Sequence, residues 1–217
     1  MIKLHGFHRS SATYRVRIAL HLKGLDYVSI EHDLARGEHR QPDYLCLNPQ
    51  GLVPTLETDG LVLTQSQAII EYLDEVYPHI PLLPADPRGK ARVRALYQLI
   101  AADTHHVTSM RAGAYLRTRL GVDEQQVREW QHHWLRESFT AAERWLGSGP
   151  HGRFAHGDQP TLADIALVPQ VHAARRLELG LAAWPNLLRV VENSLAEPAF
   201  ARAHPENQAG QDFMVCA

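Results

Sequence analysis

The stretch RSSATYRVRIALHLKG, residues 9–24, contains the start, body and end of one predicted helix. Ser10 or Ser11 can act as its N-cap, because a hydroxyl oxygen accepts a hydrogen bond from a free N–H group of the first turn. Apolar residues recur at helical spacing as far as Lys23. Gly24 then stands where the C-terminus of a helix favours glycine. The sequence therefore predicts a helix that begins near Ser11 and ends at Lys23.

Strands are predicted on both sides of this helix. Residues 2–7 precede it as a short strand, and residues 27–33 follow it with the alternation of a second strand. A strand, a helix and a strand in so short a span form a βαβ unit, which is expected to be parallel and right-handed.

The next segment predicts a β-hairpin and a further helix. A third strand at residues 53–57 follows the turn at 48–51, and Asp59-Gly60 is a strong hairpin signal before residues 61–63. Ser66 then caps a helix that runs to about residue 77. The order β-α-β, an irregular or short helical stretch, then β-β-α is that of a thioredoxin-like domain.

The character of the sequence changes near residue 80. Four prolines within residues 78–87 cannot continue a helix or a central strand, so this segment is a predicted linker. Beyond it Thr161 and Asp164 resemble a capping box. The fold class is therefore α/β plus all-α, with domains at 1–80 and 88–217. Helices of the second domain are expected near 88–118, 123–147, 161–178 and 186–196, with Pro169 kinking the third or lying in its early turns.

Composition excludes several classes of protein. The net charge of −2 over 217 residues predicts neither nucleic acid nor an anionic membrane as partner. There is no apolar run of the roughly 20 residues that span a bilayer, and no signal-peptide pattern, so a cytoplasmic protein is expected. Cys46 and Cys216 form no disulfide framework, and Cys46 is expected to be buried. The 14 histidines meet no ligand spacing, so no metal site is predicted.

Three positions could bind a small anionic thiol. Ser10 and Ser11 lie at the positive end of a helix dipole, where a thiolate would be stabilised. Val53-Pro54 could contain a cis bond and expose the Val53 backbone. Gln65-Ser66 could offer N–H groups to a carboxylate. Each position also has an ordinary explanation when taken alone: plain serine caps in the first and third cases, and a trans proline at an edge strand in the second.

Four blocks of sequence resemble the zeta class of glutathione transferases. They are SSATYRVRIAL at 10–20, NPQGLVPTL at 48–56, QSQAIIEYL at 65–73 and TLADIALVPQV at 161–171. The resemblance covers essentially the whole chain. It implies a thioredoxin-like domain followed by a helical domain, a homodimer, and glutathione as cofactor.

The resemblance also assigns roles to individual residues. Ser10 and Ser11 match the thiol-activating serines, with Arg9 beside them. The remaining glutathione contacts would be His39, Val53, Pro54, Gln65 and Ser66, with Asp103 and His105 from the helical domain. One departure is Ala12, where the zeta pattern usually has cysteine. Its absence weakens reactions that need a protein thiol, such as reductive dehalogenation.

Arginines point to a substrate with carboxylates. The guanidinium fork suits a carboxylate better than a lysine ammonium does. Arg176 matches the family's substrate-carboxylate arginine, Arg111 resembles a second arginine of bacterial maleylpyruvate isomerases, and Arg9 flanks the thiol site. The predicted activity is isomerisation of maleylacetoacetate or maleylpyruvate, in aromatic amino acid catabolism. A general conjugating transferase or peroxidase, and a non-catalytic glutathione-binding protein, are the alternatives.

Overall fold

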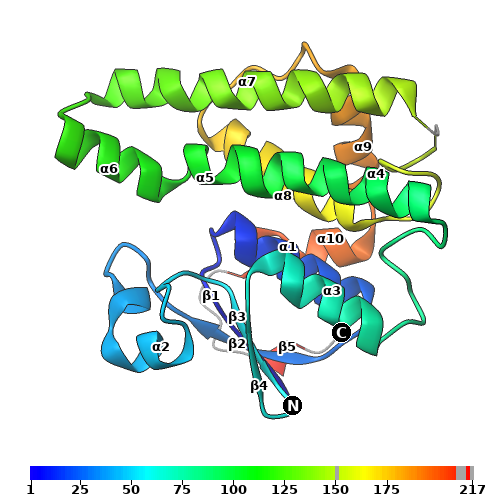
Figure 1. Ribbon diagram of the computed structural model, residues 1–217, viewed down its shortest axis with the longest axis horizontal. Coiled ribbons are helices and arrows are strands. Elements are labelled where there is room, and N and C mark those ends of the chain that lie inside the picture. The colour runs from blue at the N-terminus through cyan, green and yellow to red at the C-terminus, as the bar shows by residue number, and fades with distance from the viewer. Residues whose placement is uncertain (150–151, 209–213, 216–217) are drawn as a thin grey trace. The chain divides into compact units, whose positions relative to one another are not determined.

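The computed structural model describes residues 1–149, 152–208 and 214–215 (Figure 1). Contacts between Cα atoms divide the chain into two compact units, and each is described by itself. The first unit contains residues 1–81 together with the chain from 196 onward, and the second contains residues 82–195. This grouping differs from the expected helical domain at 88–217, because the last helix packs in the first unit.

The first unit is built on a five-stranded sheet. β1 and β2 are parallel, as the predicted βαβ unit requires, and every other neighbouring pair is antiparallel. Asp59 and Gly60 both have positive φ (49° and 78°), the conformation of a tight two-residue hairpin. The strands, in the spatial order β4-β3-β1-β2-β5, are β1 (Ile2–Gly6), β2 (Tyr27–Glu31), β3 (Thr55–Thr58), β4 (Leu61–Thr64) and β5 (Met214–Val215). The short β5 was not predicted.

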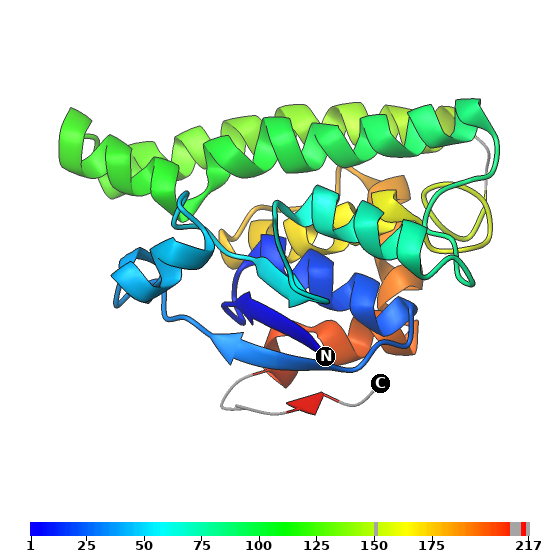
Figure 2. The ribbon, with the colours of Figure 1, turned by 60° about the horizontal axis from the view of Figure 1, so that its bottom comes forward.

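Helices α1 and α3 run along one face of this sheet (Figure 2). The buried Lys23 side chain joins their C-terminal ends, donating to Asp74 Oδ1 at 2.5 Å and to the Tyr77 carbonyl at 2.8 Å. The negative end of the α3 dipole also favours a cation at this position. The helical segments of the unit are α1 (Ser11–Leu22), η1 (Glu38–Arg40), α2 (Pro42–Leu47), α3 (Ser66–Val76), α10 (Pro198–Ala203) and η3 (Pro205–Asn207).

Helix α10 belongs to the first unit through a buried arginine on α1. Arg17 Nε donates to the Ala203 carbonyl at 3.0 Å, and its terminal nitrogen donates to the His8 carbonyl at 2.9 Å. Tyr14 adds a longer hydrogen bond to the Phe200 carbonyl at 3.5 Å. Burial lowers the pKa of Arg17 to about 10, so the side chain remains charged at neutral pH. The residues after 196 therefore complete this unit.

The expectation of a buried Cys46 was wrong. Tyr44 is the buried residue of α2, and Cys46, two positions further along the helix, lies on its exposed side. Cys216 lies outside the described residues.

The second unit consists of helices. The single helix expected at 88–118 is wrong, because a π-helical segment interrupts it and the chain breaks at Ser109, which caps the next helix by accepting from Ala112 N. Pro169 lies in the middle of α8, inside a helix that continues through it. The helices are α4 (Pro87–Gln98), η2 (Leu99–Thr104), α5 (His105–Thr108), α6 (Met110–Leu120), α7 (Glu124–Ser148), α8 (Leu162–Arg176) and α9 (Pro185–Leu195).

Candidate active site

Three segments of the first unit meet at one edge of its sheet. β1 ends at Gly6, β3 begins at Thr55 and β4 ends at Thr64. The register pairs Thr55 with both His5 and Thr64. The loop into α1, the Val53–Pro54 bond and the start of α3 directly adjoin these strand ends. The register therefore gathers them at the same edge.

The start of α1 offers a positive helix end. Ser10 is the N-cap, since its Oγ accepts from Thr13 N at 3.2 Å, and Ser11 is the first helical residue. The Ser10 hydroxyl accepts this bond and still has its own proton to donate. The first turn contains no acidic side chain of its own, and the dipole of the helix favours negative charge there. Arg9, exposed, comes directly before the cap.

Gly6 brings the end of β1 against this first turn. A Cβ atom at position 6 would lie 2.3 Å from Thr13 Cγ2, a distance that the packing does not allow. The Thr13 hydroxyl also accepts a hydrogen bond from Phe7 N at 3.4 Å. Glycine at this position therefore fixes how closely the loop of residues 7–10 follows the sheet edge.

The Val53–Pro54 peptide bond is cis, one of the two alternatives that the sequence left open. Strand pairing of β3 starts only at Thr55, so Val53 lies outside the ladder. The preceding Leu52 carbonyl accepts from Tyr44 Oη at 2.6 Å and from Asn48 Nδ2 at 2.7 Å. The backbone before the cis bond is thus held from helix α2 and its C-cap.

The start of α3 is a second positive helix end. Gln65, not Ser66, occupies the N-cap position, because its backbone (φ 68°, ψ 115°) is not helical. Its exposed side chain donates from Nε2 to Gln50 Oε1 at 2.8 Å. Ser66 is buried as the first helical residue, and no acidic side chain lies in the first turn. Gln50 was missed as a site residue, although it belongs to the Asn-Pro-Gln-Gly turn.

His39 lies in the short helix η1, beside that turn. A Cβ atom at Gly51 would lie 3.1 Å from the His39 carbonyl oxygen. The His39 Nδ1 atom is buried without a hydrogen-bond partner within the described chain. Burial and the neighbouring Arg40 lower the pKa of His39, so the imidazole is neutral at pH 7.

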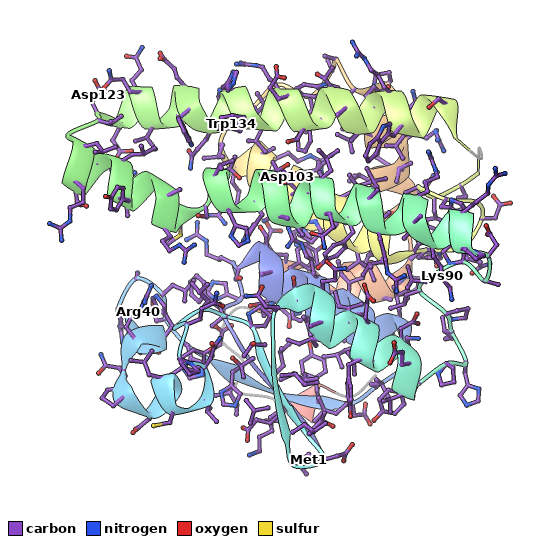
Figure 3. All side chains as sticks on the ribbon, in the orientation of Figure 1. Met1, Arg40, Lys90, Asp103, Asp123 and Trp134 are labelled. Carbon is purple, nitrogen blue, oxygen red and sulfur yellow. The ribbon has the colours of Figure 1, made fainter. Side chains whose placement is uncertain are left out.

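The remaining predicted residues lie in the second unit. Asp103 is exposed on the π-helical segment η2, and the half-buried His105 begins α5 (Figure 3). Arg111 and Arg176 are exposed on different helices, the first near the start of α6 and the second at the end of α8. Asp103 and His105 are two residues apart, on either side of the junction between η2 and α5.

Hydrogen bonds join three helices of this unit beside Ser109, where the helical conformation is interrupted. The Thr108 carbonyl accepts from Gln131 Nε2 of α7 at 3.0 Å. Gln170 Nε2 of α8 lies 3.4 Å from the Thr108 hydroxyl. Thr108 itself donates to the Thr104 carbonyl at 2.8 Å. These hydrogen bonds fix the end of α5 and thereby the direction in which α6, which includes Arg111, continues after Ser109.

Among residues 1–149, 152–208 and 214–215, no three histidine, cysteine or acidic side chains form a cluster suited to a metal ion. The described helices include none that is long and apolar enough to cross a membrane.

Comparison with known proteins defines the family. Residues 9–76 match the model of the glutathione S-transferase N-terminal domain, and residues 122–193 match that of the C-terminal domain. The chain is 49% identical to a maleylacetoacetate isomerase of Pseudomonas aeruginosa, covering 95% of this chain and 97% of that protein. It is 45% identical to a maleylpyruvate isomerase of Ralstonia sp., covering 95% and 98%.

A solved structure agrees with these sequence matches. The maleylacetoacetate isomerase of Methylobacterium extorquens with bound malonate and glutathione is 40% identical, with a TM-score of 0.93 over 96% of this chain and 98% of that one. An α/β unit of this strand order, followed by a helical unit, is the architecture of a glutathione transferase. The chain belongs to the zeta class of the glutathione S-transferase family.

Proposed function

We propose that the protein is a glutathione-dependent isomerase that converts maleylacetoacetate or maleylpyruvate to its fumaryl isomer. The observation that supports this most directly is the open start of α1, with Ser10 and Ser11, at the same sheet edge as the cis Val53–Pro54 bond. Relatives at 45–49% identity, named as isomerases of these two substrates, support the same reaction.

Residues of the first unit fit the polar groups of glutathione. The α3 N-terminus, with Gln65 and Ser66, would hold the γ-glutamyl carboxylate, because its N–H groups face no acidic side chain of their own turn. The backbone of Val53, which lies outside the strand ladder, would pair with the cysteine backbone. His39 would contact the glycine end through its ring. Asp103 and His105 are the candidate contacts from the helical unit.

The serines would act on the sulfur atom. Bound glutathione supplies a thiolate that adds to the cis double bond and leaves again after rotation, so it is regenerated. Ser10 or Ser11 would donate a hydrogen bond to that sulfur while the α1 dipole favours its negative charge. Each unit by which the thiol pKa falls corresponds to about 1.4 kcal/mol in favour of the ionised form.

The arginines favour an isomerase over the alternatives. A maleyl-keto acid has two carboxylates, which Arg9, Arg111 and Arg176 would bind and orient. A general conjugating transferase or peroxidase acting on apolar electrophiles needs none of them. Ala12 also removes the neighbouring thiol that reductive chemistry would use. The complete set of Ser10, Ser11, Gln65 and Ser66 argues against a protein that only binds glutathione.

The state and location of the protein are further parts of this proposal. A homodimer follows from the family resemblance, and the exposed Leu61 and Val62 on the edge strand β4 are consistent with a covered surface. A cytoplasmic location fits an enzyme that requires the reduced glutathione pool. The reaction would serve tyrosine or gentisate catabolism, depending on which maleyl substrate it accepts.

A spectrophotometric assay of both maleyl substrates, with and without glutathione, tests the reaction. We expect turnover of at least one substrate that depends on glutathione, and turnover of neither would refute the isomerase. Ser10→Ala and Ser11→Ala then identify the activating hydroxyl, since that variant should lose about 100-fold in kcat.

Arg176→Ala tests the division of the pocket. The variant should lose about 100-fold in kcat/KM for the maleyl substrate and still bind glutathione, because it removes only a carboxylate partner. Arg175→Ala is the matched control, an exposed arginine at the preceding position of α8. Equal losses in the two variants, or loss of glutathione binding in Arg176→Ala, would contradict the assignment.

A further inference from the structure

A polar ladder crosses the face of the sheet against which α2 packs. Lys3 Nζ lies 3.5 Å from Glu57 Oε1, and the same oxygen lies 2.7 Å from His5 Nε2. His5 Nδ1 in turn lies 3.0 Å from His32 Nε2. Lys3 and His5 are two apart on β1 and pair with Glu57 and Thr55, so all four side chains point to one face. The row runs from the exposed Lys3 to His5, which is only 6% exposed and so needs hydrogen-bond partners.

The partners in this ladder fix where its protons lie. His5 donates a hydrogen bond that lowers the pKa of Glu57, so the carboxylate is ionised and can only accept. His5 therefore donates from Nε2 to Glu57, and its Nδ1 lies within hydrogen-bond distance of His32 Nε2. Burial lowers the pKa of His32, which favours the neutral form of that ring.

Tyr44 of α2 rests on this histidine pair. Its ring centroid lies 4.5 Å from that of His32 and 6.2 Å from that of His5, and the residue is 2% exposed. The phenol oxygen lies 2.6 Å from the Leu52 carbonyl and 2.9 Å from Thr55 Oγ1. A phenol has one proton, which goes to the Leu52 carbonyl, so the Thr55 hydroxyl donates to Tyr44. Burial raises the pKa of Tyr44, which keeps that proton in place.

The Leu52 carbonyl and the Val53 N–H belong to the same peptide group. A peptide group is planar, so an oxygen fixed in direction also fixes the N–H on the opposite side of the bond. Tyr44 and Asn48 both donate to this oxygen, from 2.6 and 2.7 Å. Their two bonds therefore determine where the Val53 N–H points, immediately before the cis bond to Pro54.

We infer that Tyr44, supported by the His5–His32 pair, is a positioning residue for glutathione. It orients the Val53 backbone that receives the cysteine part of the tripeptide, and it does not touch the reacting atoms. The inference rests on the proposed glutathione site. In this inference, side chains on the sheet face that Tyr44 contacts preorganise the Val53 backbone for glutathione.

Tyr44→Phe is the direct test, because it removes the hydroxyl and keeps the ring on the histidines. We expect the Kd and KM for glutathione to rise about three- to tenfold, the value of one hydrogen bond to a backbone group. The kcat at saturating glutathione should stay within about twofold, because the thiol site is untouched. Tyr27→Phe is the matched control, a tyrosine of the same unit that is 1% exposed and whose hydroxyl has no hydrogen-bond partner in the described chain.

Two further variants keep the inference open to refutation. Asn48→Asp keeps the acceptor for Gln50 N and replaces the donor to Leu52 by an oxygen, so it should raise the Kd in the same way. His5→Leu removes the support beneath Tyr44 and should raise it less. An unchanged Kd in both Tyr44→Phe and Asn48→Asp, or a Tyr44→Phe loss confined to kcat, would overturn the inference.

The Kd is measured by calorimetry with glutathione alone, so it does not depend on turnover. A wild-type protein that binds glutathione but isomerises neither maleyl substrate would refute the proposed reaction and leave the positioning role to be decided by these affinities. Wild-type isomerisation with equal affinities in the wild type, Tyr44→Phe and Asn48→Asp would refute the positioning role alone.

Discussion

The N-termini of α1 and α8 both favour negative charge, but only one of them has an acidic side chain in its first turn. At α1, Ser10 caps one N–H group, and no acidic side chain occupies the first turn. At α8, the fully buried Asp164 accepts from Ala155 N at 2.8 Å, from Thr161 N at 2.8 Å and from the Thr161 hydroxyl at 2.9 Å. The first turn of α8 thus contains a carboxylate, and the first turn of α1 contains none.

Two further helices show the same contrast. In the helical unit, α7 has a capping box formed by Asp123 and Gln126. In the α/β unit, α3 has no acidic residue in its first turn and no side-chain cap. A helix start is therefore informative about ligands only when the chain has not already filled it.

Removing the internal anion should have the largest effect. Asp164→Ala leaves two backbone N–H groups and a hydroxyl buried without their acceptor, and should cost about 3–5 kcal/mol of the free energy of unfolding. Asp123→Ala, the control at the exposed capping box of α7, should cost about 1 kcal/mol. Urea denaturation of both variants measures the difference. Similar losses would show that the buried carboxylate contributes no more than an ordinary cap.

Acidification should separate the buried titratable groups of the two units. Burial lowers the pKa of His21, on α1 and 3% exposed, to about 4. The unfolded chain binds that proton more readily, so stability falls as pH drops from about 6.5 to 4, by about 3 kcal/mol from this group. Burial raises the pKa of Asp164 to about 6, so its contribution instead falls as pH rises from about 4 to 6.

His21→Leu isolates these opposite slopes. The variant should remove most of the acid-induced loss seen in wild-type urea denaturation between pH 7 and pH 4.5, and leave a slope closer to the sign that Asp164 imposes. His79→Gln, at an exposed histidine of the same unit, serves as the control. A wild-type slope retained in His21→Leu would place the acid sensitivity elsewhere.

Filling the open helix end should have the smallest effect on free energy and a clear effect on binding. Ala12→Asp puts a carboxylate in the first turn of α1 while keeping Ser10 and Ser11. Repulsion of a thiolate there should weaken glutathione binding about tenfold at unchanged thermal midpoint. Gln125→Asp places the same charge at the corresponding position of α7 and should change neither. Full affinity in Ala12→Asp would mean that the dipole of α1 does not act on the ligand.

Much of this organisation was predictable because it depends on local chemistry. The caps at Ser10 and Thr161, the hairpin at Asp59-Gly60 and the parallel βαβ unit all follow from neighbouring residues. The sequence indicated each segment of the candidate site: the start of α1, the Val53–Pro54 bond and the start of α3. The strand register explains why these three segments lie at the same edge of the sheet.

What sequence could not predict depends on distant packing. Ser109 breaks a helix without glycine or proline, and a lone serine in a helical pattern does not signal such a break. The π-helical segment alters the periodicity that a helix prediction assumes. The support of Leu52 by Tyr44 and Asn48 requires an α2 segment whose position only the folded chain defines.

The bond from Arg17 to the Ala203 carbonyl has a consequence for synthesis on the ribosome. Arg17 and its His8 acceptor emerge early, yet the Ala203 acceptor of the Nε atom is made only when residue 203 has been translated. The helical unit, residues 82–195, lies between Arg17 and Ala203 in the sequence, so it is synthesised before the first unit is complete. A protein fragment that ends at residue 81 would therefore lack the Ala203 acceptor of Arg17. A stable version of the first unit alone must include residues 196–208, joined to residue 81 by a linker.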